Sequence, residues 1–187
     1  MHSFEWVESA LGVIIALSMT RLVLSIANMF IARRQVRLDW VPFVWSVTIF
    51  LLLLELSWNF VHLGAQVKVW NFSMFLMLLV LVFNLFFAAV LILPNTEAQS
   101  GGDLRDWYDL NGRWSTLFIA FYTLLTEPFY WRFLNVSPIQ NFAAIVIICF
   151  SIVAFFAKSR PVLLSATILV SLSVGELVVQ MALRNQL

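Results

Sequence analysis

The chain has few charged residues and a single cysteine. Only 11% of its 187 residues are Asp, Glu, Lys or Arg, whereas a soluble domain carries about a quarter. One cysteine, Cys149, excludes a disulfide within the chain and a cysteine metal cluster. The net charge of +1 offers no concentrated basic face for nucleic acid. No Ser–His–acid set or glycine-rich phosphate loop points to an enzyme.

Histidine is also scarce, and this limits the possible cofactors. The chain has two histidines, and only His62 lies inside an apolar run. A haem held by two histidines is therefore excluded within one chain, and ligands for a catalytic metal are lacking. We expect no cofactor and no bound metal.

What the chain has in abundance is hydrophobic residues, which make up 62% of it and gather in six runs. A bilayer core of about 30 Å needs roughly 20 apolar residues per helix. We therefore predict an all-α integral membrane bundle, a single domain over residues 1–187 with six transmembrane helices. Their approximate ranges are 7–32, 40–63, 72–93, 114–134, 142–157 and 162–183.

The polar stretch between the third and fourth runs has its own pattern. Ser100-Gly101-Gly102-Asp103 resembles a helix-capping signal. Leu104, Trp107 and Leu110 would then form an apolar stripe opposite charged residues. The pattern predicts a short cytoplasmic helix over about 103–111 that lies in the membrane interface.

Lysine and arginine are distributed unequally between the loops. Seven follow the first, third and fifth runs, namely Arg33, Arg34, Arg37, Arg105, Arg113, Lys158 and Arg160. The opposite side has three, namely Lys68, Arg132 and Arg184. Cytoplasmic loops are enriched in these residues. We therefore predict a multi-pass protein of the cell membrane with both termini outside.

Three glutamates fall at one depth of the predicted bundle. Glu55, Glu127 and Glu176 lie on the second, fourth and sixth runs, each three or four residues past the midpoint. That is about 5 Å beyond the bilayer centre at 1.5 Å per residue. Arg21 lies near the midpoint of the first run. Charges at such depth are costly and usually face a partner, a cavity or a pathway.

The charge balance of this layer suggests its chemistry. Because arginine stays protonated, we expect Arg21 to hold one glutamate ionised. Desolvation and a neighbouring negative charge favour the neutral form of the other two, unless they share a bound cation. Pro128, directly after Glu127, cannot donate to the carbonyl of Leu124 and would free that carbonyl beside the acid layer. An ordinary packed kink is the alternative.

Polar residues recur every three or four positions on the first, second, fourth and sixth runs. We expect these helices to surround a polar interior. The third and fifth would lie outside, facing lipid or a second subunit of a homo-oligomer. His62, near the outer border, could pass protons, or could simply form hydrogen bonds at the interface. Further lining residues are predicted at Ser18, Ser25, Asn28, Asn59, Tyr130, Ser173 and Gln180.

These patterns favour proton or cation handling by a channel or small transporter, with the three glutamates as ion- or proton-binding groups. One alternative is a non-transporting assembly partner or sensor, in which the Arg/Glu layer is structural. Another is a pocket for an organic cation, lined by aromatic residues at Trp58, Tyr122, Tyr130 and Trp131.

The stretch from Ala16 to Leu22, followed by Arg33-Arg34 and Asp39-Trp40, is similar to a group of small uncharacterised bacterial multispan proteins. The resemblance extends through Leu93-Pro94 and Asp103-Leu104-Arg105, over about the first two-thirds of the chain. It implies a bacterial inner-membrane location. It implies no activity, ligand or catalytic residue.

Overall fold

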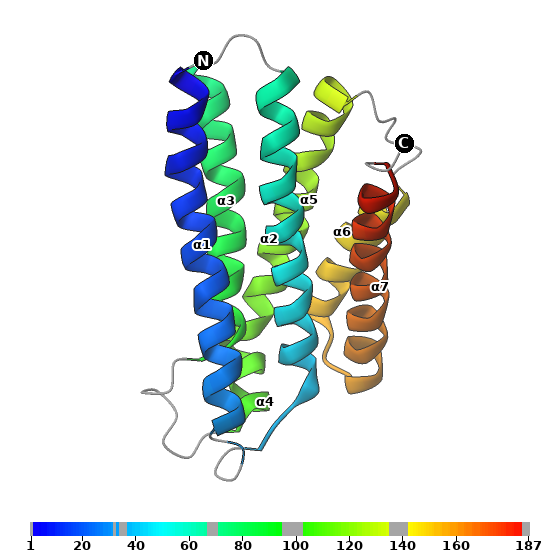
Figure 1. Cartoon of the computed structure of the whole chain (residues 1–187). Coiled ribbons are helices and arrows are strands. Elements are labelled where there is room, and N and C mark those ends of the chain that lie inside the picture. Colours follow the sequence, from blue (N-terminus) through cyan, green and yellow to red (C-terminus); the bar gives the residue numbers. More distant parts are fainter. Residues whose placement is uncertain are drawn as a thin grey trace.

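The computed structural model describes residues 2–31, 33, 37–66, 71–94, 103–134 and 142–184. Of these, residues 2–5, 61, 62, 65, 66, 129–134 and 184 are described by their backbone alone. All regular secondary structure in the described residues is helical (Figure 1). The segments are α1 (His2–Ile31), α2 (Trp40–Gln66), α3 (Phe72–Ile92), α4 (Leu104–Trp107), η3 (Tyr108–Gly112), α5 (Arg113–Leu134), α6 (Phe142–Phe156) and α7 (Arg160–Arg184).

Four of these helices are long and apolar enough to cross a membrane. Their apolar spans are Trp6–Ile31, Trp40–Phe60, Phe72–Ile92 and Arg160–Leu183. Helix α6 is apolar but has only 15 residues, or about 22 Å at 1.5 Å per residue. Helix α5 has 22 residues, and its interior includes Glu127, Pro128 and Arg132, which lower its hydropathy.

The predicted interfacial helix is helical but is not a separate element. Asp103 caps its start by accepting a hydrogen bond from the backbone N–H of Arg105, 3.0 Å away. Helix α4 then continues through the π-helical turn η3 directly into α5. The predicted boundary near residue 111 is therefore corrected, because wider backbone hydrogen bonding carries the helix through Gly112 without a break.

Helix α2 is the central helix of the bundle. It contacts α1, α3, α5 and α7, and 56% of its apolar span is buried. The buried share is 44% for α3 but only 28% for α1 and for α7. The predicted arrangement is therefore corrected for the third helix, which is more buried than the first and the sixth, although Leu177 of α7 still borders the interior. One apolar face of α3, with Leu78, Leu81 and Leu85, packs inside the bundle between α1 and α5, while Val80, Phe83 and Phe87 are exposed on another face.

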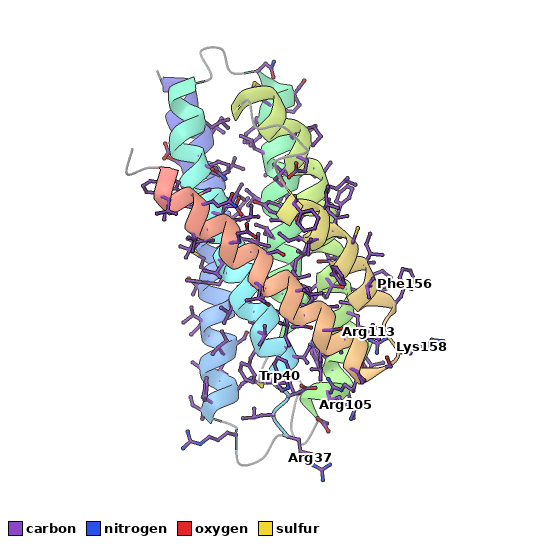
Figure 2. The ribbon with its side chains drawn as sticks, turned by 90° about the vertical axis from the view of Figure 1, so that its right-hand side faces the viewer. Arg37, Trp40, Arg105, Arg113, Phe156 and Lys158 are labelled. Atoms are coloured by element: carbon purple, nitrogen blue, oxygen red, sulfur yellow. The ribbon has the colours of Figure 1, made fainter. Side chains whose placement is uncertain are left out.

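A seam of polar contacts joins α2 and α7, which run in the same direction from the lower to the upper end of the bundle. At its lower end Asp39, which caps α2 through the N–H of Val41, forms an ion pair with Arg160. Higher up, Thr48 and Ser171 share a hydrogen bond of 2.9 Å between their hydroxyl oxygens. Figure 2 shows α7 running obliquely along this side of the bundle. These contacts fix the register of the two helices.

The two ends of the bundle differ in charge. Figure 2 shows Arg37, Arg105, Arg113 and Lys158 gathered at the lower end. Figure 1 shows the N-terminal end of α1 and the C-terminal end of α7 at the upper end. The described basic loop residues therefore lie opposite the ends of the first and last helices.

Candidate functional site

Two of the three predicted glutamates line one internal cavity. Glu55 of α2 and Glu127 of α5 both border it. Glu55 is 6% exposed and Glu127 is half-buried. The cavity volume, measured as the space open to the centre of a water molecule, is about 10 Å³, which is room for about one water. The remaining lining residues are Leu52, Tyr122, Thr123, Thr126, Ala144, Ile147 and Leu177.

Helical periodicity brings these groups together. Leu52 and Glu55 are three residues apart and share one face of α2, while Thr123 and Glu127 are four apart on α5. Helix α6 faces them with small and branched apolar side chains, including Ala144. The carboxyl groups are thus set in a mostly apolar surround, where a polar occupant must find its hydrogen bonds within the cavity.

The threonine hydroxyls present acceptors to this cavity. Thr123 donates its hydroxyl proton to the carbonyl of Ile119 at 3.0 Å. The hydroxyl of Thr126 lies 3.2 Å from the carbonyl of Tyr122 and 2.9 Å from that of Thr123. Each hydroxyl uses its only proton in these bonds. The lone pairs of the hydroxyl oxygen are left, and they can accept hydrogen bonds from an occupant of the cavity. The site is suited to an occupant that donates hydrogen bonds, such as water or a proton carried by it.

A second small cavity lies next to the first. Its volume is about 20 Å³, and Thr126 lines both. Asn59, one turn beyond Glu55 on α2, borders it together with Leu63 and with Leu78 of α3. The predicted lining residue Asn59 therefore lies beside the internal space. The side chains of His62 and Tyr130, which were also predicted here, lie outside the described residues.

Glu176 is not part of the site, which corrects the prediction of a three-glutamate layer. Its side chain is exposed and accepts a hydrogen bond from Gln180 at 3.0 Å. Gln180 is exposed as well, and Ser173 is half-buried. Helix α7 faces α2 with Thr167 and Ser171 instead, so the stripe of Glu176 is rotated away from the cavity.

Arg21 of α1 lies beside the C-terminal end of α3, and among the described residues it donates its hydrogen bonds to a hydroxyl and a carbonyl. It donates from Nη1 to the hydroxyl of Ser25 at 2.7 Å and from Nη2 to the carbonyl of Leu93 at 3.4 Å. Trp107 donates from its indole nitrogen to the carbonyl of Leu91 at 3.2 Å. The last carbonyls of a helix lack partners and carry partial negative charge. Arg21 and Trp107 therefore complete the C-terminal end of α3.

Of the three other predicted lining residues of α1, Ser18 and Ser25 form hydrogen bonds within their own helix. Ser18 is buried and donates to the carbonyl of Ile14 at 2.7 Å. Ser25 is buried and donates to the carbonyl of Arg21 at 2.8 Å. Asn28 is half-buried. None of the three borders the two cavities described above.

The freed carbonyl of Leu124 does not contribute to the site either. Leu124 is 54% exposed and Pro128 is exposed, so both side chains lie on the outer face of α5. Leu124 is not among the residues that line the cavity.

The organic-cation alternative finds little support in this geometry. A cavity with room for about one water is too small for an organic cation, and Trp58 is 47% exposed. Among the described residues, no group of three or more His, Cys, Asp or Glu side chains could hold a metal ion. The pair of carboxyls is therefore the chemical feature that remains.

Sequence reasoning missed the buried contact between Trp45 and Thr167. Trp45 is fully buried, and its indole nitrogen donates to the hydroxyl of Thr167 at 3.0 Å. The available signal was the spacing of four between Thr167 and Ser171, which marks a second polar stripe on α7.

No protein-family model, curated protein or solved structure matches the chain.

Proposed function

We propose that this protein binds protons at Glu55 and Glu127 and passes them across the membrane, as a channel or small transporter. The observation that carries the proposal is that both side chains border one cavity with room for about one water. Two carboxyl groups that share a low-dielectric site do not readily ionise together. Such a pair tends to hold one proton between its members and titrates as a unit.

The size and chemistry of the cavity favour a proton over a larger cation. Its polar lining consists of the two carboxyls and three hydroxyl-bearing side chains, Tyr122, Thr123 and Thr126. Together these groups offer both acceptors and a donor, the hydroxyl of Tyr122, to a water molecule. A water between two carboxyls provides a short route for proton exchange. The occupant in this proposal is therefore one water or the proton it carries.

A second cavity with an apolar surface extends from the site toward the upper end of the bundle, and polar groups lie toward the lower end. Toward the upper end, the second cavity begins at Thr126 and reaches Asn59 and Leu63. Toward the lower end, the Thr48–Ser171 pair lies seven residues below Glu55 along α2, or about 10 Å. In this proposal the two cavities form the outer half of the proton path. The hydroxyl seam of α2 and α7 forms part of the inner half.

The proposal includes six membrane-spanning helices in a cell membrane. Helix α5 directs Glu127 and its threonines toward the cavity, which keeps these polar groups away from lipid. The short helix α6 is accommodated by local thinning of the bilayer, as is usual for short spans. With the basic end in the cytoplasm, both termini lie outside. The resemblance to bacterial multispan proteins would make this membrane a bacterial inner membrane.

A second candidate is a non-transporting assembly partner or sensor. The contact of Arg21 with the carbonyl of Leu93 favours it, because a charged residue there serves the helix end. Under this reading the carboxyl pair would likewise only hold helices together. Proton exchange at the pair separates the two candidates.

Infrared spectroscopy of the protein in lipid tests whether the pair exchanges protons. Spectra are recorded while pH is stepped, for wild type, Glu55→Gln, Glu127→Gln and the matched control Glu176→Gln. The proposal expects a carboxyl signal that responds to pH, is lost in the first two variants and is kept in the control. An identical response in wild type and Glu127→Gln would overturn the proposal.

A further inference from the structure

Two basic residues lie beside exposed aromatic rings where α5 begins and α6 ends. Trp114 of α5 and Phe155 of α6 pack edge to face with 5.1 Å between ring centroids, and Phe156 lies 5.0 Å from Phe155. These contacts place the start of α5 next to the end of α6. Arg113 directly precedes Trp114, and Lys158 follows Phe156 by two residues. Figure 2 shows Arg113, Phe156 and Lys158 together at one lower corner of the bundle.

Two of the three cations at this corner are already paired with carboxylates. Arg113 pairs with Asp109 at 2.7 Å, and Arg160, the first residue of α7, pairs with Asp39. Lys158 is exposed and forms no ion pair within the part of the chain that the structure describes. The positive charge of Lys158 is therefore open to a partner from outside the chain.

Arg113 keeps hydrogen-bond donors although it is paired. Its Nε and Nη2 both donate to a single oxygen of Asp109, Oδ1, at 3.2 and 2.7 Å. A guanidinium has five N–H donors in a fixed fork, so this pair leaves three of them. The pair also holds the side chain in place, with 24% of it exposed. Arg113 thus offers preset donors at the same corner as Lys158.

The exposed rings extend this corner toward the apolar part of the bundle. Trp114 is 52% exposed and Phe156 is 69% exposed. Trp114 begins the apolar stretch of α5, and Phe156 ends that of α6. Tryptophan is enriched where lipid headgroups meet hydrocarbon. The order of cation, ring and apolar helix matches a phospholipid, which has a phosphate at one end and acyl chains at the other.

We propose that this corner binds an anionic phospholipid, with the phosphate at Arg113 and Lys158 and the acyl chains against Trp114 and Phe156. Arg113 donates N–H groups to phosphate oxygens, and Lys158 supplies the unbalanced positive charge. A headgroup with one net negative charge balances Lys158, whereas a zwitterionic headgroup brings its own cation. The rings favour a lipid over free phosphate, which has no apolar part to cover them. This lipid site does not depend on proton binding inside the bundle.

Native mass spectrometry of the full chain in neutral detergent tests the site. Phosphatidylglycerol and phosphatidylcholine with the same acyl chains are added separately to wild type, Lys158→Gln and the matched control Arg33→Gln. Arg33 is an exposed cation two residues beyond α1, and α1 lies on the opposite side of the bundle from α6 (Figure 1). The control therefore removes the same charge from a different place. Circular dichroism checks that each variant is folded, as expected for exposed residues.

Wild type should bind phosphatidylglycerol more tightly than phosphatidylcholine. Lys158→Gln should raise the dissociation constant for phosphatidylglycerol about five-fold and leave that for phosphatidylcholine unchanged, while Arg33→Gln should change neither. Phe156→Ser removes an exposed ring and should weaken the binding of both lipids by a similar factor, because the ring contacts the acyl chains. Glycerol phosphate, which carries a phosphate but no acyl chain, should not displace the lipid.

Three outcomes would overturn the inference. The first is a wild type that binds the two lipids equally well. The second is a folded Lys158→Gln variant that binds phosphatidylglycerol as wild type does, or no more weakly than Arg33→Gln does. The third is displacement of phosphatidylglycerol by an equal concentration of glycerol phosphate, which would assign the corner to a soluble phosphate.

Discussion

Trp45 of α2 donates a hydrogen bond from its indole nitrogen to the hydroxyl of Thr167 on α7, over 3.0 Å. Both residues are completely buried. Thr167 in turn donates a hydrogen bond from its hydroxyl to the carbonyl of Leu163 at 2.8 Å, so the indole N–H and the hydroxyl O–H both have acceptors. The contact lies between the Asp39–Arg160 ion pair and the Thr48–Ser171 pair. It therefore helps to hold α7 in the register that closes one side of the cavity.

Removing this acceptor should destabilise the bundle measurably. Thr167→Val leaves the buried indole N–H of Trp45 without an acceptor, which costs about 1–3 kcal/mol. Thr167→Ser keeps the hydroxyl and should cost less. The free energy of unfolding in bicelles measures both changes. Equal losses in the two variants would mean that packing, and not the hydrogen bond, is what Thr167 contributes.

Arg21 should matter for stability and not for proton binding. Arg21→Leu removes the cation at the C-terminal end of α3 and should lower the free energy of unfolding by about 1 kcal/mol. Arg21→Lys should restore part of it. Because Arg21 contacts Ser25 and the carbonyl of Leu93, proton flux per folded protein should stay at the wild-type level in Arg21→Lys. A shifted pH dependence of flux in that variant would indicate that Arg21 sets the charge of the glutamates.

Tyr108 gives the protein a pH-dependent loss of stability in alkali. Its hydroxyl is buried and has no hydrogen-bond partner among the described residues. Burial raises the pKa of Tyr108 above its ordinary value of 10.0. The folded protein therefore keeps this proton at a pH where the unfolded chain loses it. Stability is fully present below about pH 10 and falls as pH rises further.

Tyr108→Phe removes that proton and should flatten the alkaline part of the profile. The difference in unfolding free energy between wild type and variant, followed from neutral pH upward, isolates Tyr108 from other groups. Near neutral pH the variant should be as stable as wild type or more so, because it no longer buries an unbonded hydroxyl. Parallel profiles for the two proteins would argue against this account of Tyr108.

Hydropathy alone identifies the helices but not which of their faces meet. The apolar runs predicted helices at all six observed places, since apolar stretches of that length exclude other local structure in a bilayer. Helix α7 shows what hydropathy and periodicity cannot predict. It has two polar stripes, one with Thr167 and Ser171 and one with Glu176 and Gln180. Sequence periodicity favoured the stripe with the charged Glu176 as the inward one. In the structure the stripe with Thr167 and Ser171 packs against α2 instead.

The candidate site was half predictable for the same reason. Glu55 and Glu127 could be paired from their common depth, because both helices turn that face inward. The hydrogen-bond partner of Arg21 could not be predicted, because the partner is a carbonyl at the end of α3 and the sequence does not show where that end lies relative to α1. That end, at Leu93 and Pro94, meets α1 beside Arg21. Nor does any local pattern announce the π-helical turn at Tyr108–Gly112, which merges two predicted helices into one.

Proton flux in proteoliposomes across an imposed pH gradient is the most direct measurement of the proposed activity. Wild type is compared with Glu127→Gln and with the exposed control Glu176→Gln, each reconstituted at equal amounts of folded protein. The account predicts flux in wild type and in Glu176→Gln and its loss in Glu127→Gln. Absence of flux in folded wild type, or equal flux in all three proteins, would contradict it.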